Sequence, residues 1–283
     1  MKKGLIVIAG IVVLAVGAIA FYWSEKHQAD DSAPVETAVE VVSRPAVAPE
    51  PEPVTPPLVV GEKLPVVDPK LDELPLPPLA QSDGYVQENL AGVVGEATAM
   101  QYFANEGLVS RAVATVDALG SRQVPGNIQA IQGPPGSYAA AEDPNPPTVI
   151  LNEQGDPMPQ YLSDPANQTR YINYVEMLET MDAETFAALY RRNYPLFQQA
   201  WRELGYVDVD FNDRLDQLID ELLATPELDE PYQLIKPEAV YLFSDEDLES
   251  LTAGQKILLR MGSENAKRVK SSLREIQQAL REM

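Results

Sequence analysis

The spacing of apolar residues predicts a helical domain over the last 200 or so positions of the chain. Apolar side chains recur every three or four residues in most of this region, which is the period of one face of an α-helix. Many of the repeats start at a capping residue and stop at Gly or Pro. Helices are expected over 83–107, 109–119, 164–181, 182–205, 212–225 and 263–283, with short ones after Ser244 and Thr252.

Particular residues are expected to start or interrupt these helices. Asp83, Asp182 and Asn212 stand where a side-chain oxygen can accept from free N–H groups of a first helical turn. Pro195 falls inside the predicted 182–205 helix, where it predicts a kink or a break because proline cannot donate to the helical ladder. Helically spaced aromatic residues are expected in the core rather than along a sugar or peptide cleft: Tyr190, Tyr194, Phe197, Trp201 and Tyr206.

Residues 120–163 interrupt the helical pattern. This stretch holds 8 Pro and 5 Gly in 44 positions, and only Thr148–Leu151 suggests a strand. A loop of this length is usually either functional or disordered. The fold class expected is therefore mainly α: a single helical domain over residues 81–283 with a long irregular insertion.

The N-terminus has a different pattern, because residues 4–23 contain no charged side chain. Twenty residues of helix span about 30 Å, which is one bilayer crossing. Lys2 and Lys3, within the short tip 1–3, favour a cytoplasmic N-terminus. We expect a signal anchor here. A cleavable signal peptide is the alternative, since Ala18-Ile19-Ala20 has the form of a cleavage site.

Residues 24–80 form the third region and are expected to be a disordered linker. They hold 12 of the 25 prolines and 11 acidic against 4 basic groups. Such a segment cannot bury a core, and proline denies it regular hydrogen bonding. It would either let the domain reach a partner away from the bilayer or act only as a spacer.

Composition excludes several kinds of site. The formal net charge of −22 disfavours a nucleic-acid partner. With no Cys and a single histidine, His27, the chain lacks the parts for a thiol nucleophile, a thiolate metal centre or a Ser-His-Asp triad. No cofactor and no metal site are expected, and a non-enzymatic role is favoured.

The predicted last helix carries the main candidate surface. Its apolar residues, spaced alternately by three and four, form a seam: Ala266, Val269, Leu273, Ile276, Leu280 and Met283. From Lys256 onward the chain holds 7 basic and 3 acidic residues, whereas 203–249 holds 15 acidic and 2 basic residues. The two regions should therefore attract each other, within one molecule or between protomers. A core-packed helix with a solvated basic face and a partner-binding or oligomer surface are both open. The candidate surface comprises Lys267, Arg268, Lys270, Arg274 and Arg281.

A second set of charged residues has two members on one predicted helix and three near aromatic residues on others. It could bind an anionic ligand or form ion pairs that fix helix register: Arg111, Asp117, Arg170, Arg191 and Arg192. Asp213, Asp216 and Asp220 share one helix face. They could bind a cation or supply acid–base chemistry, although a solvated stripe or a counter-surface for basic groups is the simpler interpretation.

Several peptides of the second half resemble a known but uncharacterised family. They include Arg111-Ala-Val-Ala-Thr-Val-Asp-Ala-Leu119, Phe211-Asn-Asp-Arg-Leu215 and Leu259-Arg-Met-Gly-Ser-Glu-Asn-Ala266, within a resemblance that covers roughly 107–280. The family is one of proteobacterial envelope proteins with a domain of unknown function, an N-terminal membrane helix and a variable Pro-rich linker. The resemblance implies an inner-membrane protein facing the periplasm, and it implies no activity.

Taken together, these features predict a membrane-tethered periplasmic interaction or scaffold module of the bacterial cell envelope. It would be held in the inner membrane through residues 4–23 and would bind an envelope protein or a cell-wall component; a homo-oligomer is also open. The alternative is a carboxylate-dependent hydrolase acting on cell-wall glycan, with acids such as Glu203, Asp213 or Asp220.

Overall fold

A computed structural model describes residues 75–282, apart from 123–127, 129, 132, 135 and 153 and the side chains of 92–94. The predicted anchor 4–23, most of the predicted linker 24–80, and Met283 lie outside the described residues. Among the helices that are described, none has the length and apolar character needed to cross a membrane.

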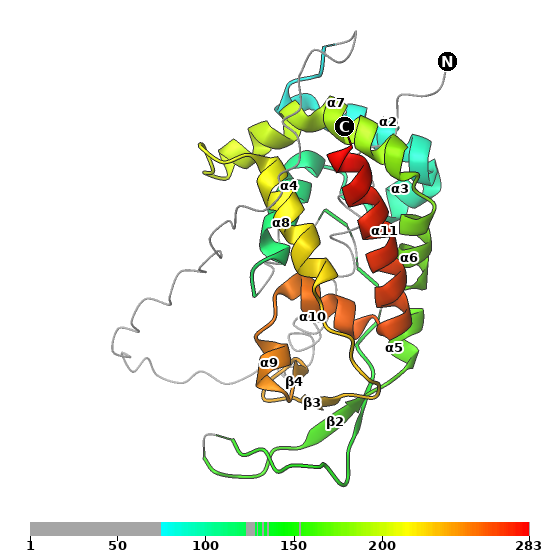
Figure 1. Ribbon diagram of the computed structural model, residues 1–283. Coiled ribbons are helices and arrows are strands. Elements are labelled where there is room, and N and C mark those ends of the chain that lie inside the picture. The colour runs from blue at the N-terminus through cyan, green and yellow to red at the C-terminus, as the bar shows by residue number, and fades with distance from the viewer. Residues whose placement is uncertain are drawn as a thin grey trace, which may run out of the picture.

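The mainly helical fold is confirmed for the described residues. A 3-10 turn, η1, precedes α2, and a small four-stranded sheet completes the domain (Figure 1). The elements are η1 (Leu79–Gln81), α2 (Asp83–Val94), α3 (Glu96–Tyr102), α4 (Leu108–Leu119), β1 (Ala140–Glu142), β2 (Gln160–Ser163), α5 (Ala166–Thr169), α6 (Ile172–Glu179), α7 (Ala183–Glu203), α8 (Phe211–Leu223), β3 (Gln233–Ile235), β4 (Leu242–Phe243), α9 (Glu246–Glu249), α10 (Ala253–Arg260) and α11 (Ser263–Arg281).

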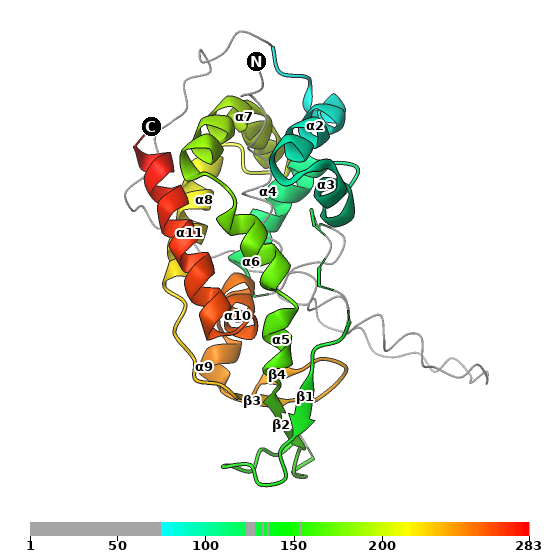
Figure 2. The same ribbon diagram turned by 90° about the vertical axis from the view of Figure 1, so that its right-hand side faces the viewer.

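The helices pack around one core, with the sheet at the end of the molecule opposite α7 (Figures 1 and 2). Helix α4 contacts α2, α7, α8 and α10, and α11 packs against α6, α7 and α8. The N-terminal side of this core begins before residue 81, because Leu79 is buried and Leu76 packs beside it. The packed domain therefore includes a few residues that composition assigns to the linker.

The predicted helix 83–107 is divided, and its predicted cap acts elsewhere. Gly95 has φ +85°, a conformation that interrupts the helix between α2 and α3. Asp83 does not cap its own helix. Its Oδ2 and Oδ1 accept from the backbone N–H groups of Gly107 and Leu108, at 2.8 and 3.0 Å, so Asp83 caps the start of α4. A carboxylate there satisfies free N–H donors and suits the positive end of the helix dipole.

The long helix α7 follows the predicted pattern but is not broken by proline. Asp182 caps it as expected, accepting from the Thr185 N–H at 2.8 Å. Pro195 lies within the continuous helix at an exposed position, so of the predicted kink or break the break is wrong. The aromatic residues of α7 are core residues, as predicted. Tyr190 stacks on Phe197, with ring centroids 5.5 Å apart.

Two other predicted caps are also wrong, for a common reason. Asn212 lies inside α8, buried, and accepts from the Tyr190 hydroxyl, while Asp210 precedes the helix. Ser244 is replaced as cap of α9 by its neighbour Asp245, which accepts from two backbone N–H groups. In both cases two capping residue types lie close together, and pattern alone does not distinguish them. Thr252 caps α10 as predicted, in a capping box with Gln255.

The interruption at 120–163 is not wholly irregular. It contributes β1 and β2 to an antiparallel sheet of order β1-β2-β3-β4. The predicted strand Thr148–Leu151 is wrong, because within it only Leu151 makes an isolated bridge, to Pro157. Strands of two to four residues are too short to show an alternating pattern. Their stability comes from a second apolar cluster: Tyr138, Tyr232, Leu234, Phe243 and Leu259.

Candidate functional site

Helix α11 places the predicted basic surface by burying the opposite face. Gly262, with φ +92°, separates it from α10, and Ser263 begins it as predicted. The apolar seam is buried as expected at Val269, Leu273, Ile276 and Leu280. Because this seam faces α6, α7 and α8, the charged side chains are left along the edges and outer side of the helix.

Two of the five candidate cations form ion pairs with other helices. Arg268 donates two hydrogen bonds to Glu179 on α6, from Nε at 2.8 Å and Nη2 at 2.6 Å, and these bonds hold the pKa of the Glu179 carboxyl below its usual range. Arg281 donates from Nη2 to both carboxylate oxygens of Asp216 on α8, at 3.0 and 3.1 Å. The predicted attraction between the basic end and the acidic middle is therefore present within one molecule.

The other three cations line one side of α11, and we call Lys267, Lys270 and Arg274 the basic strip. Arg274 is exposed and has no ion-pair partner in the described part of the chain. The Lys267 ammonium lies 3.8 Å from the exposed Glu227 carboxylate, a separation and exposure at which an ion pair contributes little. The basic strip is thus the part of the predicted surface whose cations have no strong ion-pair partner among the described residues.

A hollow opens beside the first half of the strip, between α10, α11 and the segment after α8. Its cavity volume is about 20 Å³, which is room for a single water-sized group, and part of it is open to solvent. Both polar and aliphatic residues line it: Pro226, Glu227, Leu228, Leu258, Leu259, Ser263, Ala266, Lys267 and Lys270. We call this the strip hollow.

Lys270 is the most deeply buried cation of the strip, with only 9% of its surface exposed. Its ammonium donates to the backbone oxygen of Thr225. Burial lowers the pKa of Lys270; the Glu227 carboxylate opposes this change and Arg274 adds to it. The hollow therefore contains a cation that is poorly compensated by its own protein.

The second predicted set is distributed over several different contacts. Arg111 donates from Nε to the backbone oxygen of Glu106 at 3.0 Å, and Arg192 donates to the Tyr85 hydroxyl at 3.1 Å. Arg170 donates to the Gly136 oxygen at 2.7 Å. The Nε of Arg191 is buried without a hydrogen-bond partner among the described residues.

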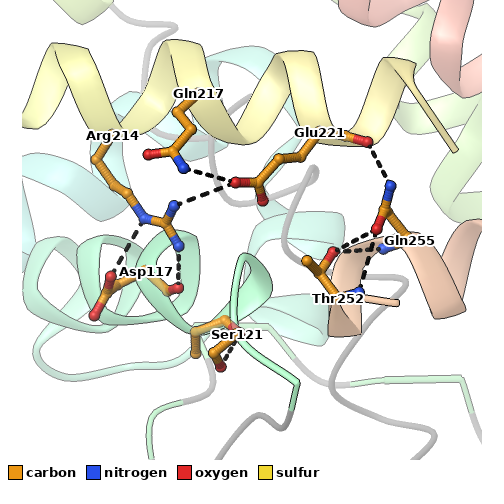
Figure 3. A network of polar contacts seen from close by, with 8 residues as sticks. Asp117, Ser121, Arg214, Gln217, Glu221, Thr252 and Gln255 are labelled. Carbon is orange, nitrogen blue, oxygen red and sulfur yellow. Dashed lines mark hydrogen bonds and ion pairs between the residues drawn. The ribbon is translucent and has the colours of Figure 1, made fainter. Parts of the chain in front are cut away.

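Asp117, the acidic member of that set, pairs with a residue that pattern analysis did not single out. Arg214 on α8 is only 1% exposed, and its Nε lies 3.3 Å from Asp117 Oδ1. Its Nη2 donates to the backbone oxygen of Asp117 at 2.7 Å (Figure 3). The Asp117 Oδ2 also accepts from Tyr206 at 3.0 Å. Of the two predicted roles for Asp117, the structure shows the ion pair between helices. This pair joins α4 to α8, and its arginine is not one of the predicted set.

The same arginine approaches a second carboxylate, as Figure 3 shows along α8. Arg214 Nη1 lies 3.8 Å from Glu221 Oε1, which accepts from Gln217 at 2.9 Å. Burial raises the pKa of Glu221, while Arg214 and Gln217 oppose that rise. Arg214 was detectable in the sequence, since it shares the inner face of its helix with Phe211, Leu215 and Leu218. A charged residue on an apolar face signals a buried pair.

A model of a known protein family matches this chain. A family described as "Protein of unknown function (DUF3014)" matches residues 108–277. The chain belongs to the DUF3014 family. Neither the curated proteins nor the solved structures include a match.

The DUF3014 match contains the buried Arg214 pair and the whole basic strip, but not Arg281. It confirms the predicted domain of unknown function. The predicted location in a bacterial envelope stays a prediction, as does any binding role of the two candidate residue sets.

The candidate acids of this DUF3014 domain do not gather in the strip hollow. Glu203 is exposed at the end of α7 and accepts from Gln199 at 3.0 Å. Asp216 and Asp220 accept from Gln277 of α11, at 2.9 and 2.8 Å. Asp216 also accepts from Arg281, which is the counter-surface role for basic groups considered for it. Over the described ranges, no three His, Cys, Asp or Glu residues are grouped so as to hold a metal ion.

Proposed function

We propose that this DUF3014 protein is a membrane-tethered interaction module of the bacterial cell envelope, with its helical domain in the periplasm. The observation that carries the proposal is the order of segments along the chain. A 20-residue run without charge at 4–23 comes first, then 57 residues with 12 prolines, and then the family domain. An anchor followed by a long proline-rich segment suits a domain that must reach a partner away from the bilayer.

The surface of the domain supports an interaction role in one respect. Most of its charged contacts link helices to one another, as Arg214, Arg268 and Arg281 do. The basic strip differs, because its cations have weak or no acidic partners within the described residues. The chain has a net charge of −22, so carboxylates to pair with these cations are plentiful. Cations that are weakly paired in such a chain indicate a binding surface more strongly than they would in a basic protein.

The location is tested by cysteine labelling, for which a chain without native Cys is well suited. Ser271→Cys places a thiol at an exposed position of α11, and a cysteine inserted between Lys3 and Gly4 is the matched control. The reagent is a maleimide that crosses the outer membrane but not the inner membrane. In intact cells of a Gram-negative host it should label the Ser271→Cys variant and not the control. Labelling of Ser271→Cys only after lysis would contradict the proposed location.

The interaction role is tested separately, by photocrosslinking in isolated membranes. A photoreactive amino acid at Lys267 should give a discrete adduct, whereas the same residue at the exposed Arg202 of α7 should not. The interaction role would be overturned if no discrete adduct formed at Lys267. It would also be overturned if the purified chain cleaved cell-wall glycan and Asp213→Asn or Glu203→Gln abolished that cleavage. The second result would favour the hydrolase.

A further inference from the structure

The basic strip has a spacing that one extended peptide can follow. Lys267, Lys270 and Arg274 lie at positions i, i+3 and i+7 of α11, so they share one side of the helix. Seven residues of helix rise about 10 Å. An extended peptide covers that distance in about three residues, at roughly 3.3 Å each. Two carboxylates placed two or three residues apart on such a peptide could each meet a cation of the strip.

Lys270 points to an anionic ligand independently of this spacing. A lysine ammonium has three N–H donors. Of these, one reaches the Thr225 oxygen, and the described residues supply no acceptor for the others. A cation that is nine-tenths buried and has a single hydrogen-bond acceptor is costly unless a nearby anion pairs with it. A carboxylate entering the strip hollow would supply both the charge and the missing acceptors.

The aliphatic lining of the strip hollow narrows the ligand further. Leu228, Leu258, Leu259 and Ala266 border the same space as the two lysines. A phosphate or sulfate ion would leave that apolar lining unused. A carboxylate carried by a peptide brings methylene groups and neighbouring side chains that can cover it.

We propose that the basic strip and the strip hollow bind a short acidic segment of a partner protein, in extended form, with an acidic side chain directed at Lys270. The proposal deepens the interaction role proposed above and rests on it. A partner segment with several carboxylates is preferred to a lone chain terminus because Arg274 extends the strip beyond the hollow.

Glu227 gives the proposal a test of opposite sign. Its exposed carboxylate lies 3.8 Å from the Lys267 ammonium and therefore competes with an incoming acid. Removing that charge should strengthen binding by about two- to fivefold, the size expected for one exposed charge pair. A surface without a carboxylate ligand would show no such gain.

The experiment uses the purified full-length chain and a fluorescent peptide, acetyl-Gly-Glu-Leu-Glu-Gly, in fluorescence anisotropy titrations at low salt. We expect saturable binding that weakens at least tenfold in the Lys267→Glu/Arg274→Glu double variant and in Lys270→Met, and that tightens in Glu227→Gln. The glutamine version of the peptide should not bind. Arg202→Glu and Glu238→Gln are matched controls at exposed positions outside the strip and should leave the affinity unchanged.

Three outcomes would overturn the proposal. Equal binding of the glutamate and glutamine peptides would exclude recognition of carboxylates. Equal losses in the strip variants and in Arg202→Glu would show a general charge effect. The acids of residues 24–80 are a competing occupant. If their replacement by amides in the full-length chain tightens peptide binding more than about tenfold, the hollow serves the chain's own acidic segment rather than a partner. Failure of the cysteine labelling above would leave this binding result unaffected.

Discussion

Gly120 tests how closely the buried arginine is fitted into the domain. It ends α4, and its backbone φ of −81° suits any residue. A Cβ atom built there would lie 2.0 Å from Arg214 Nη2 and 2.7 Å from its Cζ, far inside contact distance. Gly120→Ala must therefore displace a guanidinium that is only 1% exposed and donates to the backbone oxygen of Asp117.

The expected change in the free energy of unfolding combines two destabilising effects and one stabilising effect. Overpacking a filled interior costs about 1–3 kcal/mol. Loss of a hydrogen bond to a charged donor adds roughly 1.5–3 kcal/mol if the guanidinium cannot find another acceptor. Alanine restricts the unfolded chain more than glycine does, which returns about 0.4–1 kcal/mol. We expect Gly120→Ala to lower the free energy of unfolding by about 1.5–5.5 kcal/mol.

The assay is urea unfolding followed by circular dichroism at the helical band. Gly84→Ala is the matched control, because Gly84 lies in α2 and a Cβ there would meet no atom within 4 Å. That variant should be more stable than wild type by up to about 1 kcal/mol. Equal effects of the two substitutions, or a gain in stability for Gly120→Ala, would refute the close fit of Arg214.

A double-mutant cycle tests whether the arginine itself is the cause. Arg214→Met removes the guanidinium and should be destabilising alone, since it leaves the buried Asp117 oxygen without its cation. In that background Gly120→Ala should cost at least about 1 kcal/mol less than in wild type. Additive effects would place the clash elsewhere.

Further predictions concern three other charged groups. Asp83→Ala should lower the free energy of unfolding by about 1–2 kcal/mol, because it removes the cap of α4, and the exposed Glu88→Ala should cost less in the same urea assay. Burial raises the pKa of Glu221, so the folded state binds its proton more tightly and the contribution of Glu221 to stability falls as pH rises above the unfolded pKa of about 4.5. The stability of Glu221→Gln relative to wild type should therefore increase between pH 4 and pH 7, and a difference that stays constant over this range would contradict the prediction. Arg268→Ala should cost no more than about 1 kcal/mol, because its ion pair is partly exposed and screened by solvent; a larger loss in urea unfolding would show that the pair is structural.

Much of the candidate surface could be read from the sequence. The seam of α11 required only helical period, and burying that seam leaves the basic residues at the sides and outside of the helix. What could not be read was which cations are already paired. Arg268 and Lys267 are neighbours in the chain, yet only Arg268 meets a well-placed carboxylate, because α6 presents Glu179 to that side. Pairing depends on the neighbouring helix and not on the local pattern.

Local patterns determined those elements of this protein that need no distant partner. Helical period located α7, α8 and α11, and the caps at Asp182 and Thr252 follow from hydrogen bonds within three residues along the chain. Composition alone determined the three-part order of apolar run, proline-rich acidic segment and domain.

Tertiary structure decided every feature in which the partners are far apart in sequence. Asp83 caps α4 from 25 positions away in the sequence. Arg214 donates to the backbone oxygen of Asp117, which is 97 positions away. The short strand β2 pairs with Gln233–Ile235 of β3, which lies far along the chain, and with β1 on its other side. The physical reason is the same in each case: a buried polar group must find a partner, and packing determines which one comes within reach.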